Sequence, residues 1–307
     1  MTDPFAASGS WLRCALHAHT TNSDGELSPD ELARHYERAG FDVLAITDHW
    51  VRTRQPSTER LLVLAGTELD ARLARNGGHA HVLALGLDAD PEPPADSGAF
   101  PGLTETVAWI AERGGIPYIA HTYWSGLRPD DWEAVAGLVG LEVYNAGCEL
   151  EIGRGLASLH WDEVLERRRP CLGIATDDSH HPAHDSSLAW VWARCAERSA
   201  ESVLDALRDG SFYSSTGPKI LMLAVEDGAV EVRCTPAQSV TLLAGRRRGA
   251  RANAGRLEYP HRAEILERDA AGEIVAARLE RPAGAPYGRL EVADGQGRTA
   301  WTNPLWI

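Results

Sequence analysis

Short apolar runs alternate with amphipathic helical patterns across residues 11–217, and this alternation limits the fold more than any other feature of the chain. Strands are expected at 12–16, 43–47, 61–65, 82–85, 116–120, 141–144, 171–175 and 188–194. Helices are expected at 28–39, 103–113, 129–138, 159–168 and 200–209. Strands that alternate with helices favour a parallel sheet with right-handed crossovers, and seven or so of them predict a closed or distorted α/β barrel.

The helix expected at 28–39 has the clearest boundaries. Ser28 is a suitable N-cap, Pro29 follows it in the first turn, and Glu31 lies three residues after Ser28, as in a capping box. Gly40 suits the C-terminal end of this helix.

The pattern changes after Gly217 and Pro218. Residues 229–234 alternate apolar and polar side chains with a period of two, Asp294 and Gly295 form a turn signal, and helical periodicity is weak. We therefore predict two domains, which are a barrel at residues 10–217 and a small antiparallel β module at residues 218–307.

Polar side chains of the kinds that bind metals, or orient metal ligands, follow most of the predicted strands. They are His17, His19, Asp24, Asp48, His49, Glu68, His121, Asn145, Asp177, Asp178 and His180. In a parallel α/β barrel the carboxyl ends of the strands meet on one face, so we expect these residues to share one pocket. Imidazoles and carboxylates without thiolates suit Zn, Mn or Fe in a catalytic site.

Each of these short patterns also occurs by chance in proteins that hold no metal. His17 and His19 lie on one face of an extended chain, but an isolated pair of this kind is weak evidence. Four such clusters at predicted strand ends rarely coincide in a purely structural barrel. Together they predict a metal site.

The net charge and the distribution of apolar residues exclude several other classes. A formal net charge of −14 disfavours broad binding of DNA or RNA, although a small anionic substrate at a metal site stays possible. No apolar stretch approaches the roughly 20 residues of a membrane helix, and the N-terminus lacks the pattern of a signal peptide. The five cysteines are scattered, which fits small core residues in a reducing compartment. We expect a cytoplasmic protein.

Several of these motifs together resemble the PHP superfamily, named for polymerase and histidinol phosphatase. The match begins with LHAHTTNSDGELSPDELARHYERAGFDVLAITDH and continues through Gly66-Thr67-Glu68, His81-Val82-Leu83, Ala120-His121 and TDDSH at 176–180. It covers roughly the first 215 residues in order. The later pieces Trp161-Asp162, TDDSHH, FYSSTGP and AWTNPLWI resemble a subgroup that includes carbaryl hydrolases and has a C-terminal β domain.

The resemblance implies a distorted (β/α)7 barrel that holds two or three divalent metal ions (Mn, Zn or Fe). It implies a first metal held by His17, His19 and Asp178. Glu68 would bridge this metal to a second one, which His81 and His121 would hold. A third metal would be held by Asp24, His49 and His180, with Asp24 at a position where some family members have His.

His79 and His81 compete for one place in this ligand set. His79 lies two residues before His81, on the same face of an extended chain, and both precede an apolar run that a ligand would be expected to follow. The ligand is His81, His79 or neither of them.

Three further residues are candidates for substrate binding. Asn145 could bond the substrate or orient a metal ligand, with a turn-forming Asn as the alternative. Tyr123, together with the neighbouring Trp124, could form an apolar or stacking wall, with core packing as the alternative. His184 lies in a loop of His and Pro residues and could donate a proton to the leaving group, although solvated loop histidines are common.

The implied chemistry is hydrolysis by a hydroxide that bridges the metals, with Glu68, Asp178 and His180 as the catalytic residues. We predict a phosphoesterase that acts on a small phosphorylated compound or nucleotide. The first alternative is a carboxylic or carbamate ester hydrolase with the same metal centre. The second alternative is a non-catalytic scaffold module that the metals stabilise.

Overall fold

The computed structural model describes residues 4–73, 78–96, 99–226, 228–255 and 259–305. The N-terminal part has the strands β1 (Ser10–Ala15), β2 (Val43–Ile46), β3 (Leu62–Arg72), β4 (His79–Leu85), β5 (Ile116–Ile119), β6 (Gly140–Asn145), β7 (Leu172–Thr176), β8 (Trp190–Cys195) and β9 (Phe212–Ser215). Its helices are α1 (Pro29–Arg38), α2 (Leu103–Glu112), α3 (Pro129–Trp132), α4 (Ala146–Ile152), α5 (Ser158–Glu166), α6 (Pro182–Asp185) and α7 (Ala200–Asp209).

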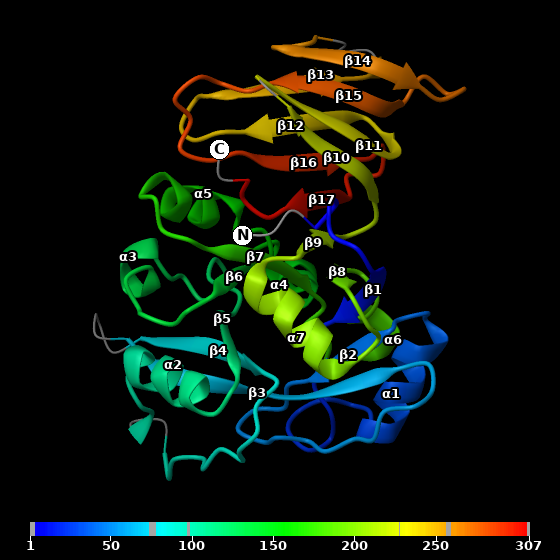
Figure 1. Cartoon of the computed structure of the whole chain (residues 1–307). Coiled ribbons are helices and arrows are strands. Elements are labelled where there is room, and N and C mark those ends of the chain that lie inside the picture. Colours follow the sequence, from blue (N-terminus) through cyan, green and yellow to red (C-terminus); the bar gives the residue numbers. More distant parts are fainter. Residues whose placement is uncertain (1–3, 74–77, 97–98, 227, 256–258, 306–307) are drawn as a thin grey trace.

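The C-terminal part consists of strands in the ranges that the structure describes. They are β10 (Ile220–Glu226), β11 (Ala229–Ala237), β12 (Ser239–Leu243), β13 (Gly249–Asn253), β14 (Ala263–Arg268), β15 (Ile274–Glu280), β16 (Arg289–Ala293) and β17 (Thr299–Thr302). In the view of Figure 1 these strands lie above the α/β part.

The predicted elements are present, but some differ in length. The capping box of α1 is confirmed, since the Ser28 side chain accepts from the Glu31 N–H and the Glu31 carboxylate accepts from the Ser28 N–H. The helix predicted at 129–138 is wrong in length, because α3 ends at Trp132. Helices α4 and α6 were not predicted, because helices this short show no clear helical periodicity of apolar residues.

Thirteen strands form one sheet in the order β13-β12-β16-β17-β9-β8-β1-β2-β3-β4-β5-β6-β7. The pairs β1–β2, β2–β3, β5–β6 and β6–β7 are parallel, as predicted. The pairs β3–β4, β4–β5, β1–β8 and β8–β9 are antiparallel. The prediction of a parallel sheet therefore holds only in part, and the structure is a mixed α/β fold with a large sheet rich in parallel pairs.

The hairpin of β3 and β4 is the main departure from the predicted topology. A crossover between parallel strands needs about a dozen residues, so the short connection from Arg72 to His79 forces an antiparallel pair. The sequence pattern missed this pairing because the polar residues Thr67, Glu68 and Asp70 conceal the second half of β3.

The residues that follow β1 and β7 meet at the carboxyl ends of the strands. Ala18 and Ser179 form an isolated parallel bridge. The Asp178 N–H donates to the His17 carbonyl at 3.0 Å, and the His19 N–H donates to the Ser179 carbonyl at 2.9 Å. The curled sheet thus brings the first and seventh strands together at the face that carries the predicted ligands. Closure into a (β/α)7 barrel stays a prediction.

The C-terminal strands form two antiparallel layers. The sheet β10-β11-β15-β14 faces the strands β12, β13 and β16 of the large sheet across a shared apolar core. Strand β17 pairs with β9 of the N-terminal part, so the large sheet continues across residue 217. The predicted domain boundary at residue 217 therefore stays a prediction.

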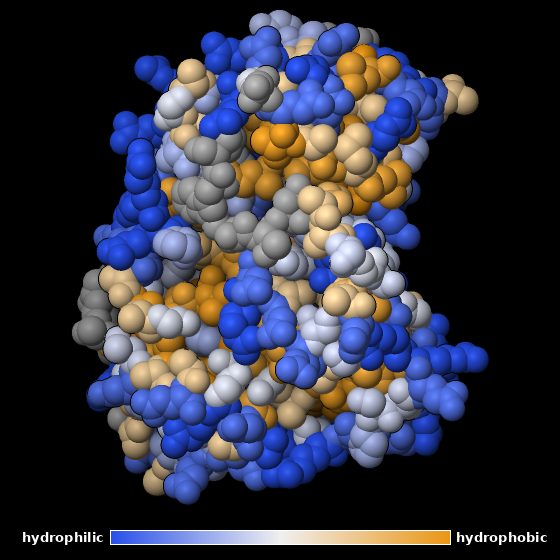
Figure 2. Space-filling model, viewed as in Figure 1, coloured by the Kyte–Doolittle hydropathy of each residue, from blue (hydrophilic) through white to orange (hydrophobic). Residues whose placement is uncertain are grey.

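The surface and the core agree with an ordinary globular chain. Figure 2 shows a mostly hydrophilic face, which apolar patches interrupt over the C-terminal strands. All five cysteines are buried and free, as predicted for small core residues. Within the described ranges, every helix is too short or too polar to traverse a lipid bilayer.

A buried ion pair joins the C-terminal strands to α5. Arg289, at the start of β16, is fully buried and donates to both carboxylate oxygens of Asp162 at 2.7 and 2.8 Å. Its third nitrogen donates to Glu291 at 2.6 Å, and its guanidinium lies 4.9 Å from the ring of Trp161. We call this contact the Arg289 clamp.

Replacing Asp162 with alanine is expected to lower the free energy of unfolding by about 3 kcal/mol, because the charge of Arg289 would stay buried without the carboxylate that it binds in a bidentate manner. Denaturant unfolding followed by tryptophan fluorescence measures this loss. The matched control is Asp130→Ala, which removes an exposed ion pair with Arg167 and should cost less than about 1 kcal/mol. Similar losses in the two variants would contradict the role of the clamp.

Candidate metal centre

Seven of the nine predicted metal ligands line one pocket of about 620 Å³, which we call the metal pocket, and the other two, His17 and His19, are grouped with Glu68 and Asp178 of its lining. They come from the ends of β1 (His17, His19), β2 (His49), β5 (His121) and β7 (Asp178, His180), from within β3 (Glu68) and β4 (His81), and from the loop before α1 (Asp24). The mixed sheet therefore gathers side chains that are far apart in the sequence, although it is not wholly parallel.

Four donor atoms form a compact, buried group beneath the pocket. Nε2 of His17 and Nε2 of His19 are 3.1 Å apart, and they lie 3.0 and 3.2 Å from Oε2 of Glu68. The same two nitrogens lie 3.1 and 3.2 Å from Oδ1 of Asp178. Ligands around a tetrahedral ion with bonds of about 2.0 Å are about 3.3 Å apart. The group therefore has the dimensions of a metal site.

The hydrogen bonds of this group leave it unsatisfied. Two ring nitrogens face each other, and Oδ1 of Asp178 is buried without a hydrogen-bond partner in the described part of the chain. No lysine or arginine is among the described residues that line the pocket. A divalent cation complements four such donor atoms, so the residues present fit one.

The carboxylate of Glu68 faces a different set of imidazoles on each side. Its Oε2 lies beside His17 and His19, whereas its Oε1 lies 2.8 Å from Nδ1 of His81 and 3.1 Å from Nε2 of His121. Glu68 is 1% exposed. One buried carboxylate thus lies between the first ligand group and a second one, which is the position that a bridging ligand requires.

Two wider groups adjoin the first. His49 joins Glu68 and His81, with its Nε2 3.6 Å from Oε2 of Glu68. Asp24 lies 3.5 Å from His19, 3.7 Å from His49 and 3.5 Å from His180. The structure thus brings together the three residues expected around a third metal, and it adds His19 to them.

His81 lies in the metal pocket, whereas His79 does not. Strand β4 begins at His79, so both residues belong to the strand. The register pairs His81 with Asp70 and places His81 beside Glu68. His79 is exposed, and its ring lies 5.2 Å from that of Phe100. Of the two candidates, the geometry favours His81.

Charges within the metal centre raise the pKa values of His17, His19, His81 and His180, whereas burial lowers that of His49. Burial alone would lower the pKa of His19, but the neighbouring carboxylates of Asp178 and Glu68 raise it to about 9. Burial also opposes the rise at His81, where the charge of Glu68 raises the pKa to about 10. Burial raises the pKa of Glu68, yet His17 and His81 hold it well below its usual value. Without a cation the imidazoles therefore keep protons that bound metals would replace.

Glu142 orients His17 and was missed by the sequence analysis. Its Oε1 accepts from Nδ1 of His17 at 2.7 Å, which leaves Nε2 of that ring for the ligand group. Glu142 also accepts from Thr176, from the His121 N–H and from Asn145. A glutamate between the apolar residues Leu141 and Val143 of strand β6 is the signal that could have revealed it.

Asn145 lies behind the ligands and does not line the metal pocket. Its Nδ2 donates to Oε2 of Glu142 at 2.8 Å and to Oδ2 of Asp178 at 3.0 Å. Its Oδ1 caps α4 by accepting from the Cys148 N–H. Asn145 thus combines two of the predicted roles, orienting a ligand and forming a turn, and it is buried away from the substrate position.

Two buried aspartates fix the loop that carries His180. Asp177 accepts from the N–H groups of residues 187–189 and from the Tyr36 hydroxyl, and burial raises its pKa to about 6. Asp185 accepts from the Ser179 hydroxyl and from the N–H groups of His180 and His181. The loop is thus anchored at both ends.

The predicted substrate residues divide into one inside the pocket and one outside it. His184 lines the metal pocket at its exposed rim, together with His181. Tyr123 is 43% exposed and lies outside the lining, where its ring contacts His160. The neighbouring Trp124 lines the pocket instead and donates its indole N–H to Glu151. Of the two aromatic residues considered for a wall, only Trp124 lines the metal pocket.

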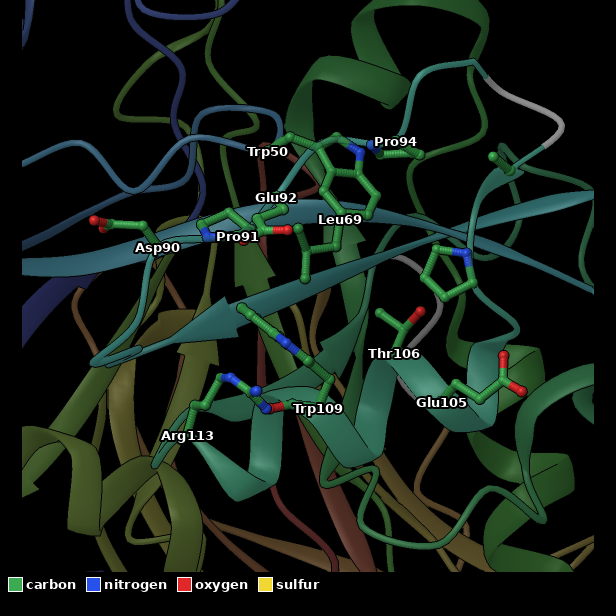
Figure 3. Close-up of a pocket in the computed structure, with 12 residues that line it drawn as sticks. Trp50, Leu69, Asp90, Pro91, Glu92, Pro94, Glu105, Thr106, Trp109 and Arg113 are labelled. Atoms are coloured by element: carbon green, nitrogen blue, oxygen red, sulfur yellow. The ribbon is translucent and has the colours of Figure 1, made fainter.

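A separate hollow of about 510 Å³ lies between β3 and α2. Figure 3 shows Trp50 and Trp109 on either side of Leu69 in this hollow. Leu69 and Glu68 are neighbours in a strand and point to opposite faces, so the hollow contains none of the predicted ligands. It contacts the metal centre through Trp50, whose Nε1 donates to Asp70, which in turn lies 3.2 Å from His81.

Three residues of the centre have a backbone conformation that non-glycine residues rarely adopt. The φ angles are 27° at His121, 54° at Asp178 and 56° at Trp50. Such conformations cost about 1–3 kcal/mol each and persist where the surroundings fix them. Their N–H groups donate to Glu142, to the His17 carbonyl and to the Glu68 carbonyl. The site's own hydrogen bonds thus hold the strained segments.

Comparison with known proteins shows similarity at the level of the fold. No family model matches the chain, and no curated protein sequence matches it. A two-domain protein from Bacteroides vulgatus, described as containing a predicted PHP-like metal-dependent phosphoesterase, matches with a TM-score of 0.53 at 17% identity. The match covers 97% of this chain and 96% of that one. The chain therefore shares the overall fold of that protein, in agreement with the sequence resemblance.

Two other solved structures match less closely. A metal-dependent phosphoesterase from Bifidobacterium adolescentis, so assigned by its description, has a TM-score of 0.41 at 18% identity over 57% of this chain and 90% of its own. An amidohydrolase from Chromobacterium violaceum, with bound sulfate and no metal, has a TM-score of 0.39 at 17% identity over 56% of this chain and 89% of its own.

Replacing His17 and His19 together with alanine is expected to remove at least one bound metal ion per chain, because two of the four donors of the compact group are lost. Elemental analysis of the folded variant measures the stoichiometry. His261→Ala, at an exposed position of the C-terminal part, is the control and should keep the full complement. An unchanged metal content in the double variant would refute the site.

Metal binding to the metal-free protein is expected to release protons and to strengthen as the pH rises from 7 to 9. The pKa values of His19 and His81 are raised to about 9 and about 10, so both rings are protonated near neutrality and must lose a proton to bind a cation. Each proton released makes affinity rise by about tenfold per unit of pH. Calorimetry in buffers of different ionisation enthalpy counts the protons. Affinity that is flat or falling over this range contradicts the assignment.

Proposed function

We propose that this protein is a PHP-type metallohydrolase that cleaves a phosphoester of a small molecule. The observation that carries the proposal is the position of Glu68, whose two oxygens face different pairs of imidazoles at the base of an open pocket. The fold shared with the PHP-like protein from Bacteroides vulgatus supports it. Two or three divalent ions, with Mn, Zn and Fe as the candidates, suit the nitrogen and oxygen donors.

Bound ions of this kind would lower the pKa of a water molecule and neutralise charge on a phosphoryl group. The protein's part is to hold the donors in place before the substrate arrives. Glu142 fixes the ring of His17, and Asn145 fixes one oxygen of Asp178 while leaving the other free. Little reorganisation is then needed during the reaction.

Residues on the open side of the pocket would act on the substrate itself. His180 lines the pocket, and its Nδ1 lies 3.0 Å from the Asp178 carbonyl, which fixes the ring with Nε2 towards Asp24. His181 and His184 lie at the rim. We assign to His184 the transfer of a proton to the departing oxygen, since it lines the pocket without belonging to a ligand group.

The substrate is proposed to be a small molecule of cytoplasmic origin. The net charge of −14 disfavours an extended nucleic acid, and the pocket volume of about 620 Å³ is in the range of small-molecule sites. A carboxylic or carbamate ester is the alternative substrate, because the same donors would polarise a carbonyl oxygen. A non-catalytic scaffold is the remaining alternative.

The purified protein supplied with Mn, Zn or Fe is expected to hydrolyse 4-nitrophenyl phosphate or its diester. The kcat/KM of Glu68→Gln is expected to fall at least a hundredfold, because the variant lacks the charge that both ligand groups share. An aryl carbamate assayed beside the phosphates separates the two ester classes. Faster carbamate turnover would favour the alternative substrate. Bound metal without turnover of any of these esters would favour the scaffold.

A further inference from the structure

A second hollow of about 550 Å³ adjoins the metal pocket and reaches the C-terminal strands. We call it the junction hollow. Leu150 of α4 lines both the metal pocket and the junction hollow. The two also share their walls, since α4 borders each on one side and the segment 181–190 borders each on the other. The far end of the junction hollow is formed by β17 and the turn before it, through Gln296, Thr299 and Trp301.

Apolar side chains stand exposed where the two hollows meet. Leu150 is 60% exposed, Leu156 is 46% exposed and Leu188 is 38% exposed. All three line the junction hollow. Single exposed leucines are common on protein surfaces, but three around one concave surface that opens from a metal centre form an apolar path. A ligand that covered them would remove this surface from water.

The charges along this path are unfavourable for a second anionic group. In the described lining of the metal pocket, the only cationic candidates are six histidines, which belong to its rim and to the ligand groups. Arg298 in the junction hollow is already paired with Asp294 at 2.7 Å. The carboxylates of Glu149, Glu151 and Asp185 lie along the same path. One anionic group at the metals is therefore accommodated, and a second one beyond them is repelled.

We propose that the junction hollow binds the non-reacting part of the substrate, and that this part is an uncharged, largely apolar chain or ring system. The proposal rests on the proposed function, which places the phosphoryl group at the metal centre. It gives Leu150, Leu156 and Leu188 the role of specificity-determining residues. It also makes the C-terminal strands a part of the substrate site, through Gln296, Thr299 and Trp301.

Binding of two phosphonates of equal charge tests the proposal without requiring turnover. Octylphosphonate, used below its micelle-forming concentration, is expected to bind the Mn-supplied protein at least tenfold more tightly than methylphosphonate, as measured by calorimetry. Each methylene that is fully buried contributes roughly a fourfold gain in affinity, so burial of only a few of them produces this ratio. A ratio near one, or no binding of either compound, would overturn the proposal.

A matched pair of variants locates the effect. Leu150→Glu is expected to reduce the octyl-to-methyl affinity ratio at least fivefold, because it places a charge where the chain lies. Leu221→Glu is the control, since Leu221 is also 60% exposed but lies on β10, outside both hollows. It should leave the ratio unchanged. Equal effects of the two substitutions contradict a specific role of the path.

A third compound tests the charge argument. Octane-1,8-diyldiphosphonate carries the same chain with a second anionic group at its far end. It is expected to bind at least tenfold more weakly than octylphosphonate, because that group meets carboxylates and no free cation of the described lining. Tighter binding of the diphosphonate would overturn the assignment of an uncharged distal group.

The outcomes separate this proposal from the proposed function. A clear octyl preference without hydrolysis of octyl phosphate supports the hollow and contradicts the phosphoesterase assignment. Hydrolysis of small phosphates without any octyl preference does the reverse. The exposed leucines could instead form a contact between copies of the chain, and light scattering on Leu150→Glu tests this explanation. If the variant changes the oligomeric state and leaves the affinity ratio unchanged, the proposal is wrong.

Discussion

The metal-binding face depends on one buried carboxylate, that of Glu68, surrounded by imidazoles. An ionised carboxylate out of water is costly unless neighbouring groups compensate its charge. Here the compensation comes from opposite sides, since β1 supplies His17 and His19 to one oxygen and β4 and β5 supply His81 and His121 to the other. The antiparallel β3–β4 hairpin brings His81 to that position. The pairing that departs from the parallel arrangement is therefore also the one that places His81 beside Glu68.

The surrounding polar groups make this arrangement rigid. Glu142, Asp177 and Asp185 each accept at least three hydrogen bonds from backbone or side-chain donors. Asp48 plays the same part in the loop after β1, where it accepts from the Thr20 N–H at 2.6 Å and from the Ser23 hydroxyl at 2.8 Å. Satisfied buried networks of this kind fix side-chain positions, which prepares the ligand set before any cation or substrate binds.

Most of the candidate ligands could be identified from the sequence because they directly follow a short apolar run. Asp24 and His81 do not, and their place in the ligand set came from the resemblance to a family. The capping box of α1 was predictable because its chemistry is local. The β3–β4 pairing could not be predicted from the sequence, because the polar residues of β3 concealed the length of this strand. Without that length, the short connection that makes β4 antiparallel was not apparent. Glu142 and Asp70 were missed because their partners, His17 and His81, lie 125 and 11 positions away and become neighbours only in the fold.

The pairing of β17 with β9 has a consequence for how the molecule can be divided. Strand β9 is hydrogen-bonded to β8 on one side and to β17 on the other. A chain that stopped after β9 would leave a row of unpaired backbone groups at the edge of the large sheet, and such an edge is a template for intermolecular strand addition and aggregation. The C-terminal strands thus protect this edge of the N-terminal part. Dissection of the chain must respect this dependence, because the two halves share one hydrogen-bonded sheet.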